Sequence, residues 1–363
     1  MPSSTSNFER VIPARPWRGM TVTVAMMLIV ATVVWELYCR SLGYAPTLND
    51  TGDLWTEARR RVEPESLVIV GDSRALFDCD LDALENGLGK RPVQLAQPGS
   101  TAFPVLTDLI QDERFHGTII CSVVPRLFFA PPGSPPMNRS EKTVRRAHTQ
   151  TLAQRAGHAL GIHLEEWFAC MKESDLTLGA LLAELPIPNR PYAQVPPPLP
   201  PYFATIDRER RARMTEQCAR PGKLQDRVKH GWIPLFTPPP PPSFVPKEAF
   251  GAQMQAAFEA RFADTKSLIN KLRARGGKIV LVRFPVSGDL KTLEDRNTPR
   301  TPTWDRLLKE TAVPGIYFED FPELASFTCP EWSHLSAGDS VEFTKRLVPH
   351  LRTALQLDTA ATN

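Results

Sequence analysis

Leu67-Val-Ile-Val-Gly-Asp-Ser-Arg74 places a short β-branched run directly before a glycine and a polar turn. A helix-like pattern follows from Ala75 to Leu88, so the sequence predicts a strand, a tight turn and a helix. Ser73 would stand on that turn, at the carboxyl end of the strand. In open parallel sheets, ligands bind at this edge.

The same alternation of apolar runs and helical patterns continues on both sides of this unit. Further strands are predicted at Val93–Ala96, Thr118–Val124, Lys278–Arg283 and Ile316–Glu319, and further helices at Leu54–Arg61, Phe103–Gln111, Phe250–Ala274, Trp304–Glu310 and Ala337–Leu355. Five such units indicate an α/β fold with a parallel sheet that is covered by helices on both faces.

The alternation breaks between Ala130 and Pro246. Of the 36 prolines in the 363 residues, 16 lie between Pro186 and Pro246. Helices are predicted inside this segment at Ser140–Leu160 and Leu176–Leu185, so we interpret it as an inserted Pro-rich lobe. Its longest proline run is either a stiff spacer or a polyproline ligand for a partner. We expect the lobe to frame the substrate entrance, and a deletion of residues 186–246 to change substrate preference more than the fold.

The composition excludes two broad classes. With 42% hydrophobic and 23% charged residues, the chain has enough apolar surface to fold, which excludes wholesale disorder. The 43 basic and 40 acidic residues give a net charge of +3, without the basic stripe of a nucleic-acid-binding protein. The densest basic run, Arg208-Glu-Arg-Arg-Ala-Arg213, is predicted to be a solvated helix face.

Six cysteines are present, and none forms a Cys-x-x-Cys pair, so a structural zinc site is not indicated. No metal or nucleotide cofactor is implied. An oxidising compartment would permit disulfides, but the sequence does not define their pairing.

Residues Gly19–Trp35 carry no charge, and the apolar stretch continues to Cys39. As a helix it would span about 31 Å at ~1.5 Å per residue, close to the ~30 Å hydrocarbon core of a bilayer. Arg10, Arg15 and Arg18 precede it, which predicts a cytoplasmic N-terminus. No small-residue cleavage site follows, which favours an uncleaved anchor in the inner membrane over a signal peptide. The remainder would face the periplasm.

These observations divide the chain into five parts. They are a cytoplasmic N-terminus (1–18), a transmembrane anchor (19–39), the first part of an α/β domain (40–130), the Pro-rich inserted lobe (131–246) and the second part of the α/β domain (247–363).

Cys329-Pro-Glu-Trp-Ser-His-Leu-Ser336 stands just before the last predicted helix. Its loop can reach back over Ser73, and Glu331 is close enough along the chain to orient the imidazole of His334. Ser73, His334 and Glu331 would then be nucleophile, base and acid of a Ser–His–acid triad, with His334 within hydrogen-bond reach of Ser73. Each motif alone has a simpler explanation, an N-cap for Ser73 and a loop histidine for His334.

Together, the two motifs resemble those of the SGNH/GDSL hydrolase superfamily over roughly residues 64–130 and 250–355. The resemblance implies a flavodoxin-like three-layer sheet, Ser73 as nucleophile and His334 as base. It also implies an oxyanion hole formed by Ser73 and Gly99. The N-terminal anchor and the Gly-Asp-Ser-Arg variant are similar to membrane-anchored SGNH proteins of bacterial exopolysaccharide clusters, among them alginate O-acetyltransferase-like proteins.

The sequence departs from the family pattern in two places. Glu331 stands where the family usually has aspartate, and no Gly-x-Asn-Asp block follows the strand at Thr118–Val124. Loss of that asparagine would remove one oxyanion donor, worth roughly 3–4 kcal/mol. Arg74 or Arg126 could supply the missing oxyanion donor, and both are predicted to bind substrate. Asp72 could contact an acyl donor or stabilise the turn.

The resemblance implies an esterase or an O-acetyltransferase acting on a polysaccharide, with a membrane-bound acyl-transfer protein as a possible partner. The alternative is a catalytically weak SGNH-like scaffold that binds polysaccharide or partners in an export complex.

Overall fold

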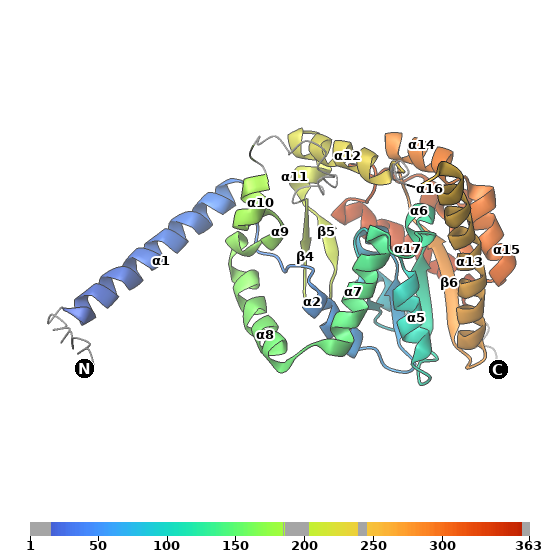
Figure 1. The fold of residues 1–363 in the computed structure, drawn as a ribbon, viewed down its shortest axis with the longest axis horizontal. Helices are drawn as coiled ribbons and strands as arrows, with labels where there is room; N and C mark the ends of the chain where they lie inside the picture. The colour runs from blue at the N-terminus through green and yellow to red at the C-terminus, as the bar shows by residue number, and fades with distance from the viewer. Residues whose placement is uncertain (1–15, 184, 186–202, 239–244, 358–363) are drawn as a thin grey trace, which may run out of the picture.

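A computed structural model describes residues 16–183, 185, 203–238 and 245–357. Its centre is a five-stranded parallel sheet in the order β2-β1-β3-β6-β7 (Figure 1). The strands are β1 (Leu67–Val70), β2 (Val93–Gln94), β3 (Thr118–Ser122), β6 (Lys278–Arg283) and β7 (Gly315–Tyr317). The predicted α/β fold with a parallel sheet is therefore confirmed.

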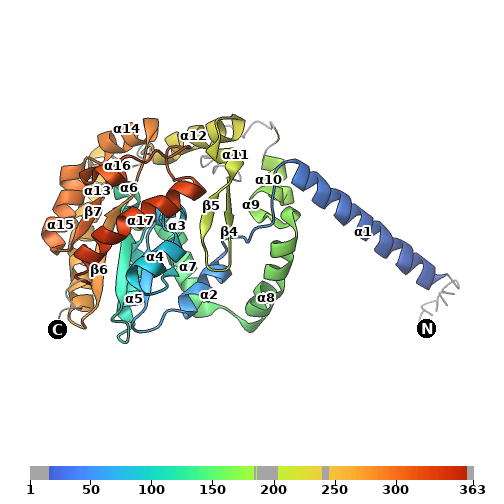
Figure 2. The same cartoon turned by 180° about the vertical axis from the view of Figure 1, so that it is seen from behind.

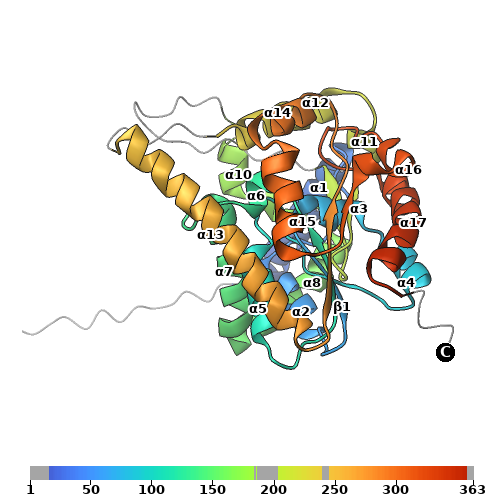
Figure 3. The same cartoon turned by 90° about the vertical axis from the view of Figure 1, so that its right-hand side faces the viewer.

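Helices cover both faces of the sheet (Figure 3). On one side lie α3 (Ser73–Asp78), α4 (Leu81–Leu88) and α17 (Ala337–Ala354), and on the other lie α5 (Phe103–Gln111), α13 (Lys247–Arg273) and α15 (Arg306–Thr311). All four residues of β1 are buried. This double cover explains why the strands are continuous apolar runs rather than alternating ones.

Several predicted helices differ from the observed ones. The helix expected from Ala75 to Leu88 is two helices, because Asp80 caps a new helix by accepting a hydrogen bond from Ala83 N. The helix expected from Ser140 to Leu160 is also two, α7 (Pro135–Thr149) and α8 (Leu152–Trp167), since Thr151 and Gln154 form a capping box. The remaining α-helices here are α2 (Gly52–Arg60), α14 (Gly288–Asn297) and α16 (Pro322–Ala325), of which only α2 was predicted. Two short helical turns, η2 (Thr301–Asp305) and η3 (Phe318–Asp320), complete this part of the fold.

Between β3 and β6 the chain leaves the sheet and returns, since these two strands pair directly, with Ile120 opposite Val280. Before it reaches α13, the intervening segment forms α6 (Pro125–Phe128), α7, α8, η1 (Ala169–Met171), α9 (Glu173–Leu176), α10 (Leu178–Ala183), β4 (Ala204–Ile206), β5 (Ala212–Met214), α11 (Glu216–Ala219) and α12 (Lys223–Phe236). Most of the proline-rich sequence, at 186–202 and 239–244, lies outside the described residues.

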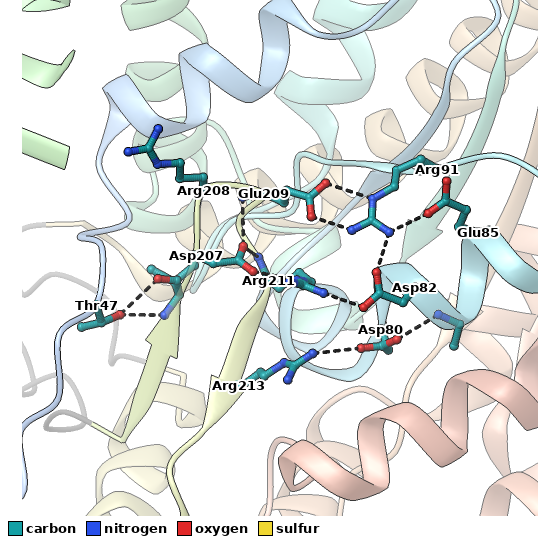
Figure 4. A network of polar contacts seen from close by, with 12 residues as sticks. Thr47, Asp80, Asp82, Glu85, Arg91, Asp207, Arg208, Glu209, Arg211 and Arg213 are labelled. Carbon is teal, nitrogen blue, oxygen red and sulfur yellow. Dashed lines mark hydrogen bonds and ion pairs between the residues drawn. The ribbon is translucent and has the colours of Figure 1, made fainter. Parts of the chain in front are cut away.

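The basic run Arg208–Arg213 was predicted to be a solvated helix face, and this prediction is wrong. The run forms the turn and the start of the second strand of the β4–β5 hairpin. Figure 4 shows Glu209, Arg211 and Arg213 of this run paired with charged residues of neighbouring elements. Arg91 contacts Glu209 at 2.9 Å and Asp82 at 2.6 Å, and Arg211 contacts Asp82 at 2.7 Å. The ion pairs hold the hairpin against α4.

Arg210, at the same turn, is fully buried. Its guanidinium pairs with Asp50 at 2.8 Å and donates to the carbonyls of Gln94 and Ala96. The inserted lobe is thereby fixed to the carboxyl end of β2, next to the loop that carries Gly99.

The N-terminal helix α1 (Trp17–Ser41) projects away from the sheet domain (Figures 1 and 2). Its mean hydropathy reaches 2.0, and by length and composition it can cross a membrane. Within it only Glu36 and Cys39 are buried. The predicted apolar segment 19–39 is therefore a helix that extends two residues further at each end.

Candidate active site

Ser73 follows β1 at the carboxyl edge of the sheet, as the first residue of α3, and its side chain is partly exposed. Gly71 makes this turn possible. Its φ is +148°, and a Cβ atom there would lie 2.4 Å from Ser122 Cβ. Only glycine allows β1 to approach the end of β3 this closely.

Asp72 stabilises the same turn. Its Oδ1 accepts a hydrogen bond from Arg74 N at 2.9 Å, and its Oδ2 accepts one from Ser122 Oγ at 2.8 Å. Because both carboxylate oxygens are used and the side chain is buried, the observed role of Asp72 is the turn-stabilising one.

Glu331 and His334 form a fully buried pair. Glu331 Oε1 lies 3.0 Å from His334 Nδ1 and also accepts a hydrogen bond from the His334 backbone N–H. The other carboxylate oxygen accepts from Trp232 Nε1, which comes from α12 of the inserted lobe. Glu331 thus orients the imidazole, and a residue of the lobe holds Glu331.

Three aromatic rings surround the imidazole of His334. The ring centroids of Phe77, Trp232 and Phe203 lie 4.4, 5.4 and 5.8 Å from it. Phe77 stands four residues after Ser73 on α3, which places it one helical turn away on the same face. The loop after β7 therefore crosses the carboxyl edge of the sheet and returns to the helix that begins with Ser73.

The Nε2 atom of His334 is buried and has no hydrogen-bond partner among the described residues. The expected hydrogen bond to Ser73 Oγ is therefore not formed in this structure. His334 has no exposed surface, so a substrate can reach its imidazole only if the aromatic cover moves.

Gly99 lies in the loop that follows β2, beside the turn of Ser73. The two loops are joined by a hydrogen bond of 3.0 Å from Gln97 N to Gly71 O. Gly99 has a φ of +57°, which favours glycine, and its carbonyl accepts a hydrogen bond from Arg139 of α7. Gln97 is buried, and both polar atoms of its side chain lack a hydrogen-bond partner within the described part of the chain.

Arg74 is buried beneath the turn, where it contacts Glu294 through two nitrogens. Arg283, at the end of β6, contacts the same carboxylate. Burial would raise the pKa of Glu294, but the two guanidinium groups outweigh it and lower the pKa to about 2. The guanidinium of Arg74 is thus committed to an internal ion pair and is not presented to a substrate.

Arg126 stands on α6, after β3. It donates a hydrogen bond of 3.0 Å to the carbonyl of Thr237, at the end of α12, and burial lowers its pKa. It also lines a surface pocket with Phe129, Phe258 and Thr298. Among the sequence-predicted binding residues, Arg126 is the one whose side chain remains partly exposed.

Asp78 is a second buried carboxyl group close to the pair. Its Oδ1 accepts a hydrogen bond of 2.9 Å from the backbone N–H of Leu335, the residue that follows His334. Its Oδ2 has no hydrogen-bond partner among the described residues. Burial raises the pKa of Asp78 well above its usual range. The contact ties the loop of His334 to the end of α3.

Within the described residues, no group of three or more His, Cys, Asp or Glu side chains is arranged to hold a metal ion, and all six cysteines are free. Sequence reasoning missed Gln97, Phe203, Trp232 and Glu294. These residues have no motif around them, and only the folded chain brings them to the site.

Comparisons of the chain with protein-family models, with curated proteins and with solved structures found no match.

Proposed function

We propose that the chain is a membrane-anchored, SGNH-like protein that carries out acyl-ester chemistry with Ser73, His334 and Glu331. The observation that carries this proposal is the buried pair of Glu331 and His334, whose Oε1 and Nδ1 atoms lie 3.0 Å apart. The imidazole of His334 has no hydrogen-bond partner at Nε2 among the described residues, and it packs on Phe77, one helical turn from Ser73. The strand order β2-β1-β3-β6-β7 is that of doubly wound, flavodoxin-like sheets, and it supports the SGNH-like interpretation.

In the proposed reaction, His334 Nε2 takes the proton of Ser73 Oγ as the oxygen attacks the carbonyl carbon of an acetyl ester. The carbon–oxygen bond to the leaving alcohol breaks, and His334 returns the proton to that alcohol. An acetyl-serine remains. Water as the second nucleophile regenerates Ser73 and releases acetate, whereas a sugar hydroxyl takes over the acetyl group. The carboxylate of Glu331 stabilises the imidazolium in both steps.

The oxyanion would be stabilised by the backbone N–H groups of Ser73 and Gly99. The asparagine of the family pattern is missing, and the side chain of Gln97 is the candidate to replace it. A buried amide without a partner costs about 1–3 kcal/mol, and a hydrogen bond to the oxyanion would recover that cost only during the reaction.

The substrate class and the location rest on the resemblance and on α1. Basic residues precede α1, which favours a periplasmic sheet domain. An acylated polysaccharide outside the inner membrane is then the proposed substrate, with hydrolysis and acetyl transfer as the two outcomes.

A second candidate function is a catalytically weak scaffold that binds polysaccharide or export partners. Its specific support is the complete burial of His334 and the absence of a hydrogen bond from Nε2 to Ser73.

The test uses the purified full chain, a serine-reactive phosphonate and an acetylated sugar ester. We expect phosphonate labelling at Ser73, and Ser73→Ala should abolish both labelling and turnover. Glu331→Gln should lower kcat by about two to four orders of magnitude, and Glu331→Asp should lower it less. No labelling of Ser73, together with wild-type turnover no higher than that of Ser73→Ala and of the uncatalysed reaction, would favour the scaffold.

A further inference from the structure

Large exposed hydrophobic side chains are confined to two places in the described part of the chain. One is α1 with the adjoining Leu42. The other consists of Leu152, Leu160, Leu164, Trp167, Leu178, Leu181, Leu182 and Leu185. We call this second group the apolar arm; it belongs to α8, α10 and the residue beyond α10. The sheet domain itself exposes no side chain of this kind among its described residues.

The apolar residues of α8 form a stripe on its outer face. Leu152, Leu160, Leu164 and Trp167 recur at helical spacing, and Trp167 is 74% exposed. The opposite face of α8 holds the helix on the domain. There His158 contacts Glu57 at 3.1 Å, Ile162 is buried, and Glu165 accepts a hydrogen bond from Asn49 N. The helix is therefore amphipathic, with its apolar side turned away from the protein.

A rigid junction connects the apolar arm to α1. The carboxylate of Glu36 accepts hydrogen bonds from Ala169 N at 3.0 Å and Cys170 N at 2.9 Å, directly after α8. Arg40 pairs with Glu36 at 2.6 Å and donates to the carbonyl of Trp167 at 3.1 Å. The end of α1 is thus fixed to the end of α8 by three polar contacts, and the Arg40–Glu36 pair within α1 holds the two side chains that make them.

The position of α8 suits a membrane surface. Figures 1 and 2 show that α8 lies beside the end of α1 and runs at a steep angle to it, on the outer side of the domain. A helix that crosses the membrane along α1 would therefore bring α8 close to the plane of the bilayer surface. Amphipathic helices with a Trp- and Leu-rich face bind at this level, where one side is apolar and the other wet.

We propose that the apolar arm docks on the bilayer that α1 crosses, with Trp167 at the boundary between headgroups and acyl chains. The occupant of this face is lipid, because the face is continuous with the membrane helix through the Glu36 junction. The arm gives the domain a second membrane contact and fixes the orientation of the sheet relative to the membrane. The inference depends on membrane insertion of α1 and is independent of the chemistry at Ser73.

The test uses the full chain in vesicles of phosphatidylethanolamine and phosphatidylglycerol. These vesicles also contain phosphatidylcholine brominated either near the headgroup or near the chain ends. Tryptophan fluorescence is compared between the wild type and Trp167→Phe, and the difference isolates Trp167. Trp35→Phe gives the same difference for a residue inside α1. We expect the Trp167 signal to fall roughly twofold with bromine near the headgroup and less with bromine near the chain ends.

Substitutions to glutamine on the two sides of α8 test its apolar face. Leu160→Gln combined with Leu164→Gln should reduce the quenching of Trp167, whereas Arg155→Gln, exposed on the polar side of α8, should leave it unchanged. Far-UV circular dichroism checks that each variant is folded. Glu36→Ala should also reduce the quenching of Trp167 while Trp35 stays quenched, and an unchanged Trp167 signal in this variant would overturn the role of the junction.

Other outcomes would overturn the proposal. If lipid bromine quenches Trp35 but not Trp167, and acrylamide quenches Trp167, the arm faces water. If Trp167 is shielded from both quenchers and cross-linking yields a dimer, the face binds a second copy instead of lipid. If neither Trp35 nor Trp167 responds to brominated lipid, α1 is not inserted and the premise is wrong.

Discussion

At the scale of single residues, Glu294 holds together the buried charges beneath the turn of Ser73. Its carboxylate is buried between the guanidinium groups of Arg74 and Arg283. Removing its charge would leave two buried cations without a counter-ion. The resulting loss in the free energy of unfolding is much larger than the net stabilisation that the intact ion pair provides.

Glu294→Gln should therefore lower the free energy of unfolding at neutral pH by about 3–5 kcal/mol. The pKa of Glu294 is lowered to about 2 from an ordinary value of 4.5, so the carboxylate's stabilisation is complete above pH 4.5 and is lost as the pH falls toward 2. The difference between variant and wild type should narrow over that range, as measured by chemical denaturation in detergent. Glu259→Gln, which breaks a surface pair with Arg306, serves as the control and should change little. A difference that is independent of pH would contradict the assignment.

Asp78 should show the opposite pH dependence. Burial raises its pKa, so the proton it holds in the folded state favours folding fully below its ordinary pKa of 3.8, and this contribution is lost as the pH rises. Asp78→Asn keeps an acceptor for Leu335 N and is neutral at every pH. The variant should melt at a higher temperature than the wild type at neutral pH, and this gain should vanish below pH 3.8. Equal melting temperatures at neutral pH would show that Asp78 is not held as a buried acid.

At the scale of elements, the inserted lobe covers the Glu331–His334 pair. Phe203 precedes β4 and Trp232 belongs to α12, and both rings contact the imidazole. The lobe also supplies Arg210, which binds the end of β2. We therefore expect a deletion of residues 186–246 to harm the fold, in contrast to the expectation from sequence, because it removes these contacts together.

Smaller changes test the cover without that loss. Combined Phe203→Ala and Trp232→Ala should increase the rate of diethyl pyrocarbonate modification at His334 by about an order of magnitude, since modification needs an exposed imidazole. Peptide mass spectrometry after timed treatment gives the rate. Trp167→Ala, a loss of an exposed ring far along the chain from the site, should leave it unchanged. If the double variant is modified as slowly as the wild type, the aromatic rings do not limit access to His334.

The sequence predicted those elements whose local pattern is strong. The strands at Leu67–Val70 and Lys278–Arg283 are apolar runs bounded by polar or glycine residues, and they were placed correctly. Helix α14 and the β4–β5 hairpin were missed because their residues are mostly polar and tertiary contacts define them. Arg208–Arg213 has good helix propensity, yet ion pairs to Asp82 and Asp207 and the buried Arg210 hold it as a hairpin.

The site was predictable only in part for the same reason. The spacing of three residues predicted a contact between Glu331 and His334, and the two side chains do form a hydrogen bond. The aromatic cover of His334 comes from residues far apart in sequence, and no local pattern marks them. The catalytic roles of Ser73, His334 and Glu331 stay predictions.

At the scale of the whole molecule, we expect α1 to cross the membrane, with the sheet domain on the periplasmic side. The protein should resist extraction by alkaline carbonate, and protease added to intact spheroplasts should digest the sheet domain. In inside-out vesicles the same domain should be protected. This follows from the apolar length of α1 and the basic residues that precede it. Protection in spheroplasts and digestion in inside-out vesicles would reverse the proposed orientation.

The pairing of β3 with β6 also sets the order in which the domain can fold. Ile120 and Val280 are neighbours in the sheet, so the central strand must wait for a partner that is made much later. Until then the backbone donors and acceptors on one edge of β3 stay open, and an unpaired apolar strand edge is a site of aggregation. Such long-range pairing slows folding because a large loop must close first. We therefore expect the nascent domain to depend on a chaperone until β6 has emerged, and a truncation before β6 to yield an aggregate rather than a smaller stable sheet.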